Sequence, residues 1–267
     1  MTPGRVSIGY CHPGEIRICF HRSLFDVILS DLADPARQRT AHPFGEIPKE
    51  CGSGGIVDGR NRIVRAFLDE SDAEWLWMVD SDAGFDHDAL ERLIASADPV
   101  ERPVVGGLSF GARYEGRAPH GGIRYRAYPT LMMWYELPDK VGFSPVASWD
   151  PGALVQVSGT GCHCLLIHRS ALERVREHFA ARFAVGEEWF SPMVHPFGPT
   201  TFSEDLSFCL RLAAADMPVF VDTSVRTTHD KGFAFLDEEF YVAQEIAAGR
   251  MTRPEAEEAS CPQPVST

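Results

Sequence analysis

Apolar and polar positions alternate along the first 107 residues in a way that predicts strands and helices in turn. Residues 6–10 are short, β-prone and followed by a Cys-His-Pro-Gly turn, and residues 16–32 have the pattern of a helix. Residues 54–69 form an amphipathic helical pattern. Residues 74–80 (Glu-Trp-Leu-Trp-Met-Val-Asp) are too short for a helix and fit a strand buried on both faces. A helix over residues 86–97, capped by Asp86 or Asp88, and a strand over residues 102–107 complete the alternation.

The rest of the chain is less regular, and the pattern there predicts elements separated by loops. This alternation favours a single α/β domain over residues 1–250, with a mixed, mostly parallel Rossmann-like sheet and helices on both faces. Residues 251–267, which are rich in Pro and Glu, are predicted to be a flexible tail. The remaining predictions are loops at 35–53 and 186–202, strands at 130–137, 153–157, 163–168 and 218–222, and helices at 170–183 and 203–216. The strands at 153–157 and 163–168 are expected to pair with each other.

Composition restricts the function classes. The chain has 267 residues, 25 Lys plus Arg against 38 Asp plus Glu, and a formal net charge of −13, which disfavours nonspecific attraction to nucleic acid or anionic membrane. The longest apolar runs are far shorter than the roughly 20 residues of a membrane span, and the first residues lack the features of a signal peptide. The seven scattered cysteines are then expected to be reduced thiols in a soluble cytoplasmic protein.

Asp80-Ser81-Asp82 is the strongest candidate for chemistry. It follows the most buried predicted strand, at the carboxyl end where α/β sheets bind ligands. Two neighbouring carboxylates repel unless a cation or a proton lies between them, and hard oxygen ligands suit Mg²⁺ or Mn²⁺. The alternative is a helix-capping turn leading to Asp86.

Other motifs have both a structural and a functional interpretation. Arg60 falls in the apolar arc of its helix, with Asn61 at the edge, so Arg60 either pairs with a core carboxylate or faces a ligand cleft. Ser158-Gly-Thr-Gly161 is either a tight hairpin or a turn that a ligand approaches closely. In Ser203-Glu204-Asp205, Ser203 caps a helix, and one carboxylate either stabilises the helix start or serves as a general base.

Two histidine-containing segments raise the question of metal binding. His229 is either a lone surface histidine or a third metal ligand, with Lys231 nearby to neutralise phosphate charge. Cys162-His163-Cys164 fits no common zinc signature, and in a strand its two cysteines would share one face while His163 points to the other. Zinc binding is therefore disfavoured.

In this order, these motifs resemble the A-type-fold (GT-A) glycosyltransferases, and among them the family 2 inverting nucleotide-sugar enzymes. The resemblance covers roughly residues 5–232 and implies a nucleotide-sugar-binding half (1–107) and an acceptor-binding half (108–250). It implies Mn²⁺ or Mg²⁺ bound by Asp80, Asp82 and His229, and Asp205 as the base that deprotonates the acceptor hydroxyl. The donor side would comprise Tyr10, His12, Arg60, Asn61, Asp80, Ser81 and Lys231, and the acceptor side Gly159, Thr160, Gly161 and Glu204.

Two other functions stay open at this point. A sugar-phosphate nucleotidyltransferase uses a related sheet, but normally has a Gly-rich loop with Lys or Arg after the first strand, where this chain has Cys-His-Pro-Gly-Glu-Ile-Arg. A non-catalytic sugar-nucleotide-binding module would have no need of a base. Residues 108–152 and 183–202 match no known pattern, so the acceptor is open between a protein, a modified nucleobase, a glycan or lipid-linked sugar, and a small molecule. The donor sugar, its base and the oligomeric state are also open.

Overall fold

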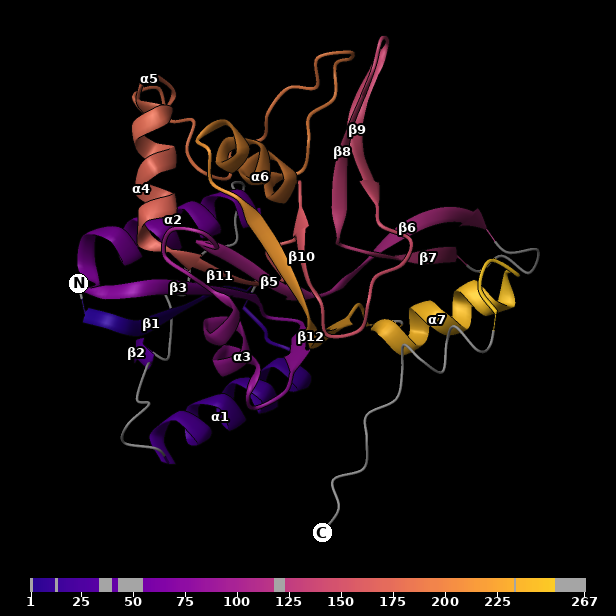
Figure 1. Ribbon diagram of the computed structural model, residues 1–267, viewed down its shortest axis with the longest axis horizontal. Coiled ribbons are helices and arrows are strands. Elements are labelled where there is room, and N and C mark those ends of the chain that lie inside the picture. Colours follow the sequence, from indigo (N-terminus) through magenta and orange to yellow (C-terminus); the bar gives the residue numbers. More distant parts are fainter. Residues whose placement is uncertain are drawn as a thin grey trace.

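A twisted central sheet organises the protein. The computed structural model describes residues 2–12, 14–33, 40–42, 55–117, 123–232 and 234–252. Within these residues the sheet has nine strands, of which β4 (Ala83–Phe85) and β13 (Phe235–Leu236) pair only with β12. The other seven follow one another in the order β10 (Leu154–Val157), β12 (Val219–Asp230), β5 (Val104–Leu108), β11 (Cys164–His168), β3 (Ala73–Asp80), β1 (Thr2–Cys11) and β2 (Thr40–His42) (Figure 1).

The strand directions confirm the predicted fold class. β1 is parallel to both β2 and β3, and β12 is parallel to β5. β11 runs antiparallel between β3 and β5, so β3 and β5 point the same way, and only β10 and β11 of the seven-strand path are reversed. The sheet is therefore mixed and mostly parallel.

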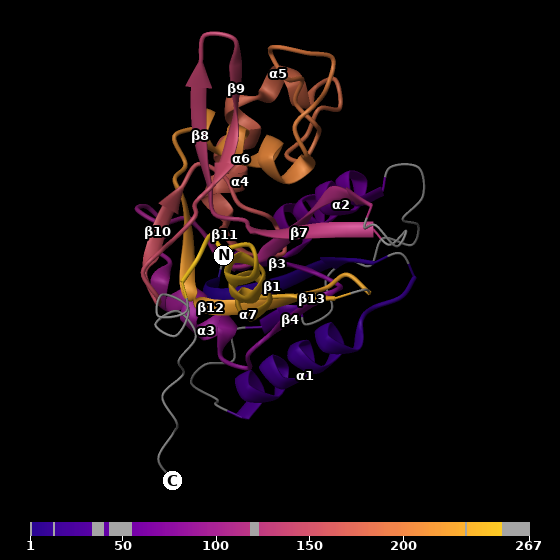
Figure 2. The same ribbon diagram turned by 90° about the vertical axis from the view of Figure 1, so that its right-hand side faces the viewer.

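Helices cover both faces because β3 is apolar on both sides, as its sequence predicts. Trp75 and Trp77 contribute to one core layer, and Leu76 and Met78 contribute to the other, since successive side chains of a strand point to opposite faces. The first layer is closed by α1 (Ile18–Ala33) and α3 (Ala89–Ser96), and the second by α2 (Gly55–Glu70) and α4 (Arg169–His178) (Figures 1 and 2).

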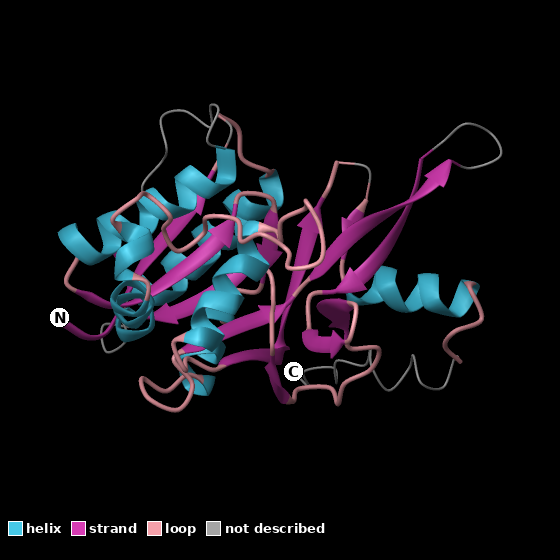
Figure 3. Cartoon of the chain, turned by 90° about the horizontal axis from the view of Figure 1, so that it is seen from above, coloured by secondary structure: helices cyan, strands magenta, loops and turns pink. Residues whose placement is uncertain are grey.

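The later half of the chain adds two hairpins and three further helices to the sheet and its covering helices. Figure 3 shows the hairpins and the last helix of this part on the opposite side of the molecule from the N-terminus. Among the described helices, none is both long enough and apolar enough to cross a membrane. The added elements are β6 (Phe110–Arg117) with β7 (Ile123–Pro129), β8 (Met132–Leu137) with β9 (Lys140–Pro145), and helices α5 (Ala180–Phe183), α6 (Glu204–Ala214) and α7 (Glu238–Ala247).

Several sequence-based predictions of local structure are wrong. β10 and β11 do not pair, because β10 lies at the sheet edge against β12 while β11 is inserted between β3 and β5. The turn at 158–161 is therefore a connection across the sheet and not a hairpin. β12 continues to Asp230, well beyond the predicted end at residue 222, since its buried threonines look polar in sequence.

Smaller differences follow from local chemistry. Residues 40–42 form β2 inside the predicted 35–53 loop, whose other residues, like the predicted tail beyond residue 252, lie outside the described part. Asp88 occupies the N-cap of α3, but its side chain accepts no helix N–H and instead pairs with Arg92 at 2.7 Å. Ser203 caps α6 as predicted, its side chain accepting the Leu206 N–H.

Candidate active site

Four potential metal ligands meet at one edge of the sheet. Asp80 ends β3, Asp82 lies in the turn after it, and His229 is near the end of β12. His163 immediately precedes β11, and because β11 runs antiparallel to β3, its start lies where β3 ends. One ligand atom from each of the four residues lies within 4.8 Å of the others. The structure thus brings together the three ligands expected from the sequence and adds a fourth, His163.

Backbone carbonyls orient both histidine rings of the cluster. His163 Nε2 is 3.1 Å from the Thr228 carbonyl oxygen, and His229 Nδ1 is 3.0 Å from the Phe110 carbonyl oxygen. A carbonyl oxygen only accepts, so each ring places its N–H there and directs the lone pair of its other nitrogen towards a carboxylate.

These directed lone pairs face electron-rich oxygens. His163 Nδ1 is 3.5 Å from Asp80 Oδ2, and His229 Nε2 is 3.2 Å from Asp82 Oδ2. Burial lowers the pKa of His163, which favours its neutral form, although Asp80 opposes this shift. Each ring has one nitrogen near a carbonyl oxygen and the other near a carboxylate oxygen. A neutral imidazole has a single N–H, so one of these two nitrogen–oxygen contacts has no proton between its atoms. A backbone carbonyl on the opposite nitrogen is the usual arrangement of a metal-binding histidine, so the four residues form a candidate cation site.

A second cluster surrounds Arg60, whose side chain is only 3% exposed. Its Nη2 is 2.9 Å from Asp80 Oδ1, and its Nη1 is 3.2 Å from Glu204 Oε1 and also contacts Asp205 Oδ1. Arg60 therefore satisfies both interpretations left open by the sequence: it pairs with carboxylates, and those carboxylates line the candidate site. Through Asp80 it links the metal-ligand cluster to the start of α6.

The carboxylates of the two clusters have opposite pKa shifts. The pKa of Asp80 falls well below its ordinary value, because Arg60 and His163 outweigh the burial that would raise it. The pKa of Asp82 is also lowered, by His229 and Lys231 against burial. Burial raises the pKa of Asp205 to about 6; Arg60 opposes this shift and Glu204 adds to it. The site therefore contains two carboxylates with lowered pKa values beside one whose pKa is raised to about 6.

The Cys162-His163-Cys164 segment behaves differently from the sequence-based expectation. Cys162 belongs to one core layer and Cys164 to the other, because residues 162 and 163 form a turn and the strand begins only at residue 164. Burial raises the pKa of both thiols, so they stay protonated and are poor metal ligands. His163 is the functional candidate that the sequence analysis missed; its signal was a histidine in the turn before a buried strand.

The other residues expected on the donor side lie in different surroundings. Lys231 Nζ is 3.2 Å from Asp82 Oδ2, at the metal-ligand cluster. Tyr10 is buried and packs against Phe20, with 5.0 Å between the ring centroids. His12 Nδ1 accepts the Gly14 N–H, and the Ser81 carbonyl accepts the Arg17 N–H. These contacts stabilise the turns next to the cluster.

Asn61 has a structural contact. Its side-chain oxygen accepts the Phe190 N–H at 3.0 Å and so fixes the 186–202 loop against α2. The side chain is buried, at 5% exposure. Asn61 thus supports the wall of the site next to Arg60, and this hydrogen bond occupies the oxygen that was expected to face the nucleotide.

The glycine-containing turn lies directly against the Asp205 carboxylate. A Cβ on Gly161 would lie 3.7 Å from Asp205 Oδ2, so the turn backbone is in contact distance of the candidate base. A Cβ on Gly159 would approach Phe143 to 2.7 Å and Leu206 to 2.9 Å, which shows how closely the β8–β9 hairpin packs here. Thr160 is buried and its hydroxyl is 3.4 Å from that of Thr130.

Comparisons with known proteins give likeness of fold alone. No protein-family model matches the chain, and no curated protein matches it by sequence. Among solved structures it is similar to A197 from STIV, with 15% identity, a TM-score of 0.43, and coverage of 84% of this chain and 85% of that chain. It is also similar to GalNAc-T7, solved with UDP, GalNAc and Mn²⁺, with 10% identity and a TM-score of 0.46. That match covers 84% of this chain and 43% of the other.

Proposed function

We propose that this protein is a metal-dependent glycosyltransferase with a GT-A-type fold, which transfers a sugar from a nucleotide-diphosphate donor to an acceptor hydroxyl with inversion. One observation carries the proposal. At the carboxyl edge of a mostly parallel sheet, a candidate four-residue cation site adjoins a half-buried carboxylate with a raised pKa, and Arg60 contacts both. The proposal extends the motif resemblance described above to chemistry.

Asp80, Asp82, His163 and His229 would hold the cation. Carboxylate oxygens suit Mg²⁺ and Mn²⁺, and two imidazole nitrogens in the same set favour Mn²⁺. A bound divalent cation supplies charge stabilisation for the departing nucleoside diphosphate. Lys231, 3.2 Å from Asp82, adds a positive charge on the same side for the phosphate oxygens.

Asp205 would be the general base. A carboxylate with a pKa of about 6 is ionised at neutral pH, yet basic enough to accept a proton from a hydroxyl as that hydroxyl attacks. The acceptor oxygen forms a bond to the anomeric carbon, the bond from that carbon to the diphosphate oxygen breaks, and the proton passes to Asp205. Arg60 keeps Asp205 oriented, and the side-chain-free Gly161 leaves space beside the carboxylate.

The alternatives have less support. A nucleotidyltransferase would need backbone amides and a cation after β1 for a triphosphate, but this chain has Cys11-His12-Pro13-Gly14 there, and His12 Nδ1 is already occupied by the Gly14 N–H. A module that only binds sugar nucleotides gains nothing from a half-buried carboxylate whose pKa is raised towards neutrality.

Direct metal binding and donor turnover test the proposal. We expect titration calorimetry to detect Mn²⁺ binding to the wild-type protein. Asp82→Asn or His229→Gln should weaken the Mn²⁺ affinity by at least tenfold. Asp86→Asn is the matched control, because Asp86 is exposed, lies four residues beyond Asp82 and belongs to no ligand cluster among the described residues. A panel of sugar nucleotides is then assayed for hydrolysis and transfer with Mn²⁺ or EDTA.

The outcomes separate the candidate functions. Consumption of a sugar nucleotide that EDTA and Asp82→Asn abolish supports the glycosyltransferase. Turnover of a nucleoside triphosphate with a sugar 1-phosphate identifies a nucleotidyltransferase instead. Donor binding without any turnover identifies a binding module, and activity that survives both EDTA and Asp82→Asn removes the metal-dependent mechanism.

A further inference from the structure

A cavity of about 710 Å³ is lined by Leu206, the residue that follows Asp205 in α6, and by residues of the β6–β7 and β8–β9 hairpins. Its wall includes Met132, whose N–H bonds to the Gly159 carbonyl of the glycine-containing turn. Asp205 also contributes to the raised pKa of Tyr128, which lines the same cavity. The cavity is therefore close to the candidate base Asp205.

The charged groups of this cavity are unevenly paired. Arg126 and Arg250 both contact Glu245, Arg126 at 3.2 Å and Arg250 at 2.7 Å, and the Glu245 side chain is only 6% exposed. Arg113 also lines the cavity, and within the described part of the chain its side chain makes no hydrogen bond or ion pair, although its charge acts on Tyr128. Arg113 is exposed and lines the cavity, so its guanidinium is accessible to a ligand that enters there.

The position of Arg113 on the β6–β7 hairpin makes the unpaired charge more significant. Arg113 lies directly opposite Arg126 across the two strands. Like charges at directly opposed positions destabilise a sheet. Glu245 compensates Arg126, but within the described residues no acid compensates Arg113. Arg113 is therefore the cation of this hairpin pair that is left for a ligand.

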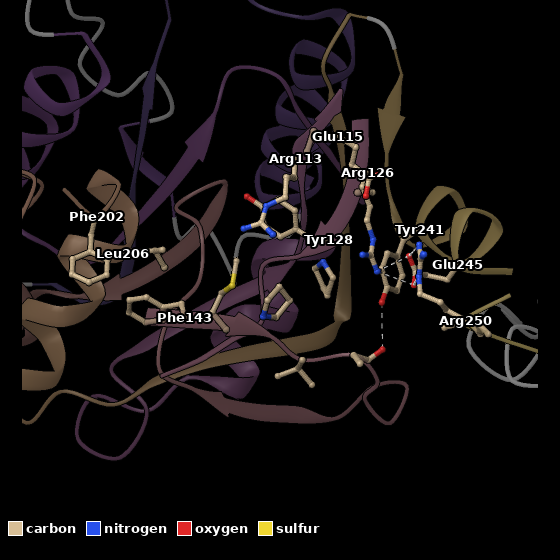
Figure 4. Close-up of a pocket in the computed structure, with 18 residues that line it drawn as sticks. Arg113, Glu115, Arg126, Tyr128, Phe143, Phe202, Leu206, Tyr241, Glu245 and Arg250 are labelled. Carbon is tan, nitrogen blue, oxygen red and sulfur yellow. Dashed lines mark hydrogen bonds and ion pairs between the residues drawn. The ribbon is translucent and has the colours of Figure 1, made fainter. Parts of the chain in front are cut away.

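Aromatic and apolar side chains complete the cavity. The Tyr128 ring lies across Gly111, where an added Cβ would come within 2.6 Å of it, so the ring position depends on this glycine. In Figure 4, Arg113 and Tyr128 lie between an apolar side formed by Phe143, Phe202 and Leu206 and a charged side formed by Arg126, Glu245 and Arg250. The cavity therefore combines one available cation with rings that can pack against a flat molecule.

We infer that the acceptor is an anionic molecule, whose carboxylate or phosphate binds Arg113 while its apolar or planar part packs against Tyr128 and Phe202. This inference rests on the proposed function, because it assigns the acceptor of the same site. A guanidinium binds carboxylate and phosphate oxygens through two parallel N–H donors, so both anion types fit. The binding places the hydroxyl end of the molecule towards Leu206 and hence towards Asp205.

Matched pairs of probes test the charge requirement without any assumption about the donor. Dissociation constants are measured by ligand-observed NMR at constant ionic strength for 4-hydroxybenzoate against 4-hydroxybenzamide, and for glucuronate and glucose 6-phosphate against glucose. We expect the anionic member to bind wild-type protein about tenfold more tightly or better, the effect of one charge-assisted hydrogen bond. The carboxylate and phosphate probes show which anion is preferred.

Substitutions assign the effect to one residue. Arg113→Gln should reduce the anionic-to-neutral affinity ratio to about one, and Arg113→Lys should retain part of it. Arg117→Gln is the matched control, because Arg117 is an exposed arginine on the same strand that does not line the cavity, and it should keep the wild-type ratio. Equal binding of charged and neutral probes by wild-type protein overturns the inference, as does an equal loss in the two glutamine variants.

This result can be distinguished from failure of the proposed function. Donor hydrolysis in Mn²⁺ requires water only and is measured without any acceptor. If hydrolysis occurs but the probes show no charge preference, the anionic acceptor is wrong and the glycosyltransferase stands. If the charge preference depends on Arg113 but no sugar nucleotide is consumed, the anion site stands and the proposed transferase does not.

Discussion

Replacing Arg60 with methionine tests the electrostatic organisation of the site. The substitution keeps an apolar side chain of similar length on α2 but removes the guanidinium that contacts Asp80, Glu204 and Asp205. Removing one partner of a buried ion pair costs about 3–5 kcal/mol, because the remaining charge stays buried without compensation. We expect a cost at the lower end of this range, because the three carboxylate side chains are 23–25% exposed. Asp80 also retains its contact with His163, whose Nδ1 is 3.5 Å from Asp80 Oδ2.

A loss of about 3 kcal/mol in the free energy of unfolding corresponds to a melting temperature lower by about 6–12 °C in a protein of this size. Arg62→Met is the control on the same helix. The Arg62 side chain is 42% exposed and pairs with Asp58 four residues earlier, an interaction worth about 0.3–0.5 kcal/mol. Both variants are compared by calorimetry and by urea unfolding.

The pH dependence of the Arg60→Met effect has a definite sign. Arg60 lowers the pKa of Asp205, so its loss moves that pKa above about 6. A carboxyl group whose pKa is raised by folding contributes stability that is fully present at a pH below its pKa in the unfolded chain. That stability is lost as the pH rises through its pKa in the folded protein. The destabilisation should therefore be larger at pH 8 than at pH 5, and adding Asp205→Asn should recover part of it. Equal melting temperatures for Arg60→Met and Arg62→Met, or a pH-independent loss, would refute the reasoning.

Three further predictions concern the metal ligand, the base and the packing of the turn. His163→Ala should weaken Mn²⁺ binding by about tenfold or more in calorimetry, while an unchanged affinity would exclude His163 from the metal site. Asp205→Asn should retain donor binding and lose transfer. In the wild type, kcat/KM should fall about tenfold per pH unit below pH 6, because protonation of Asp205 removes the base. A flat profile of kcat/KM from pH 5 to 7 would contradict this assignment. Gly159→Ala should cost about 1–3 kcal/mol of stability in urea unfolding, since the new methyl group would overlap Phe143 and Leu206; wild-type stability would show that the hairpin moves freely.

Much of the fold follows from local sequence patterns. The Trp75–Val79 segment is apolar at every position and is buried on both faces, and the helices before and after it cover those two faces. Arg60 and the Asp-x-Asp turn also stand out in sequence, because a charge in an apolar arc and two adjacent carboxylates each need a partner. These features arise from residues that are close together in the sequence, so they can be predicted without knowledge of the tertiary structure.

The position of strands relative to one another was decided by the tertiary structure. The sequence by itself determined the α/β class, the buried central strand and the two carboxylates at its end. It did not determine that β11 enters the sheet antiparallel between β3 and β5, which brings His163 to Asp80, or that Arg113 faces a cavity beside Asp205. The physical reason is that strand order and direction depend on how whole layers pack against each other. That packing is the sum of many contacts between residues far apart in the sequence, so no single segment specifies it.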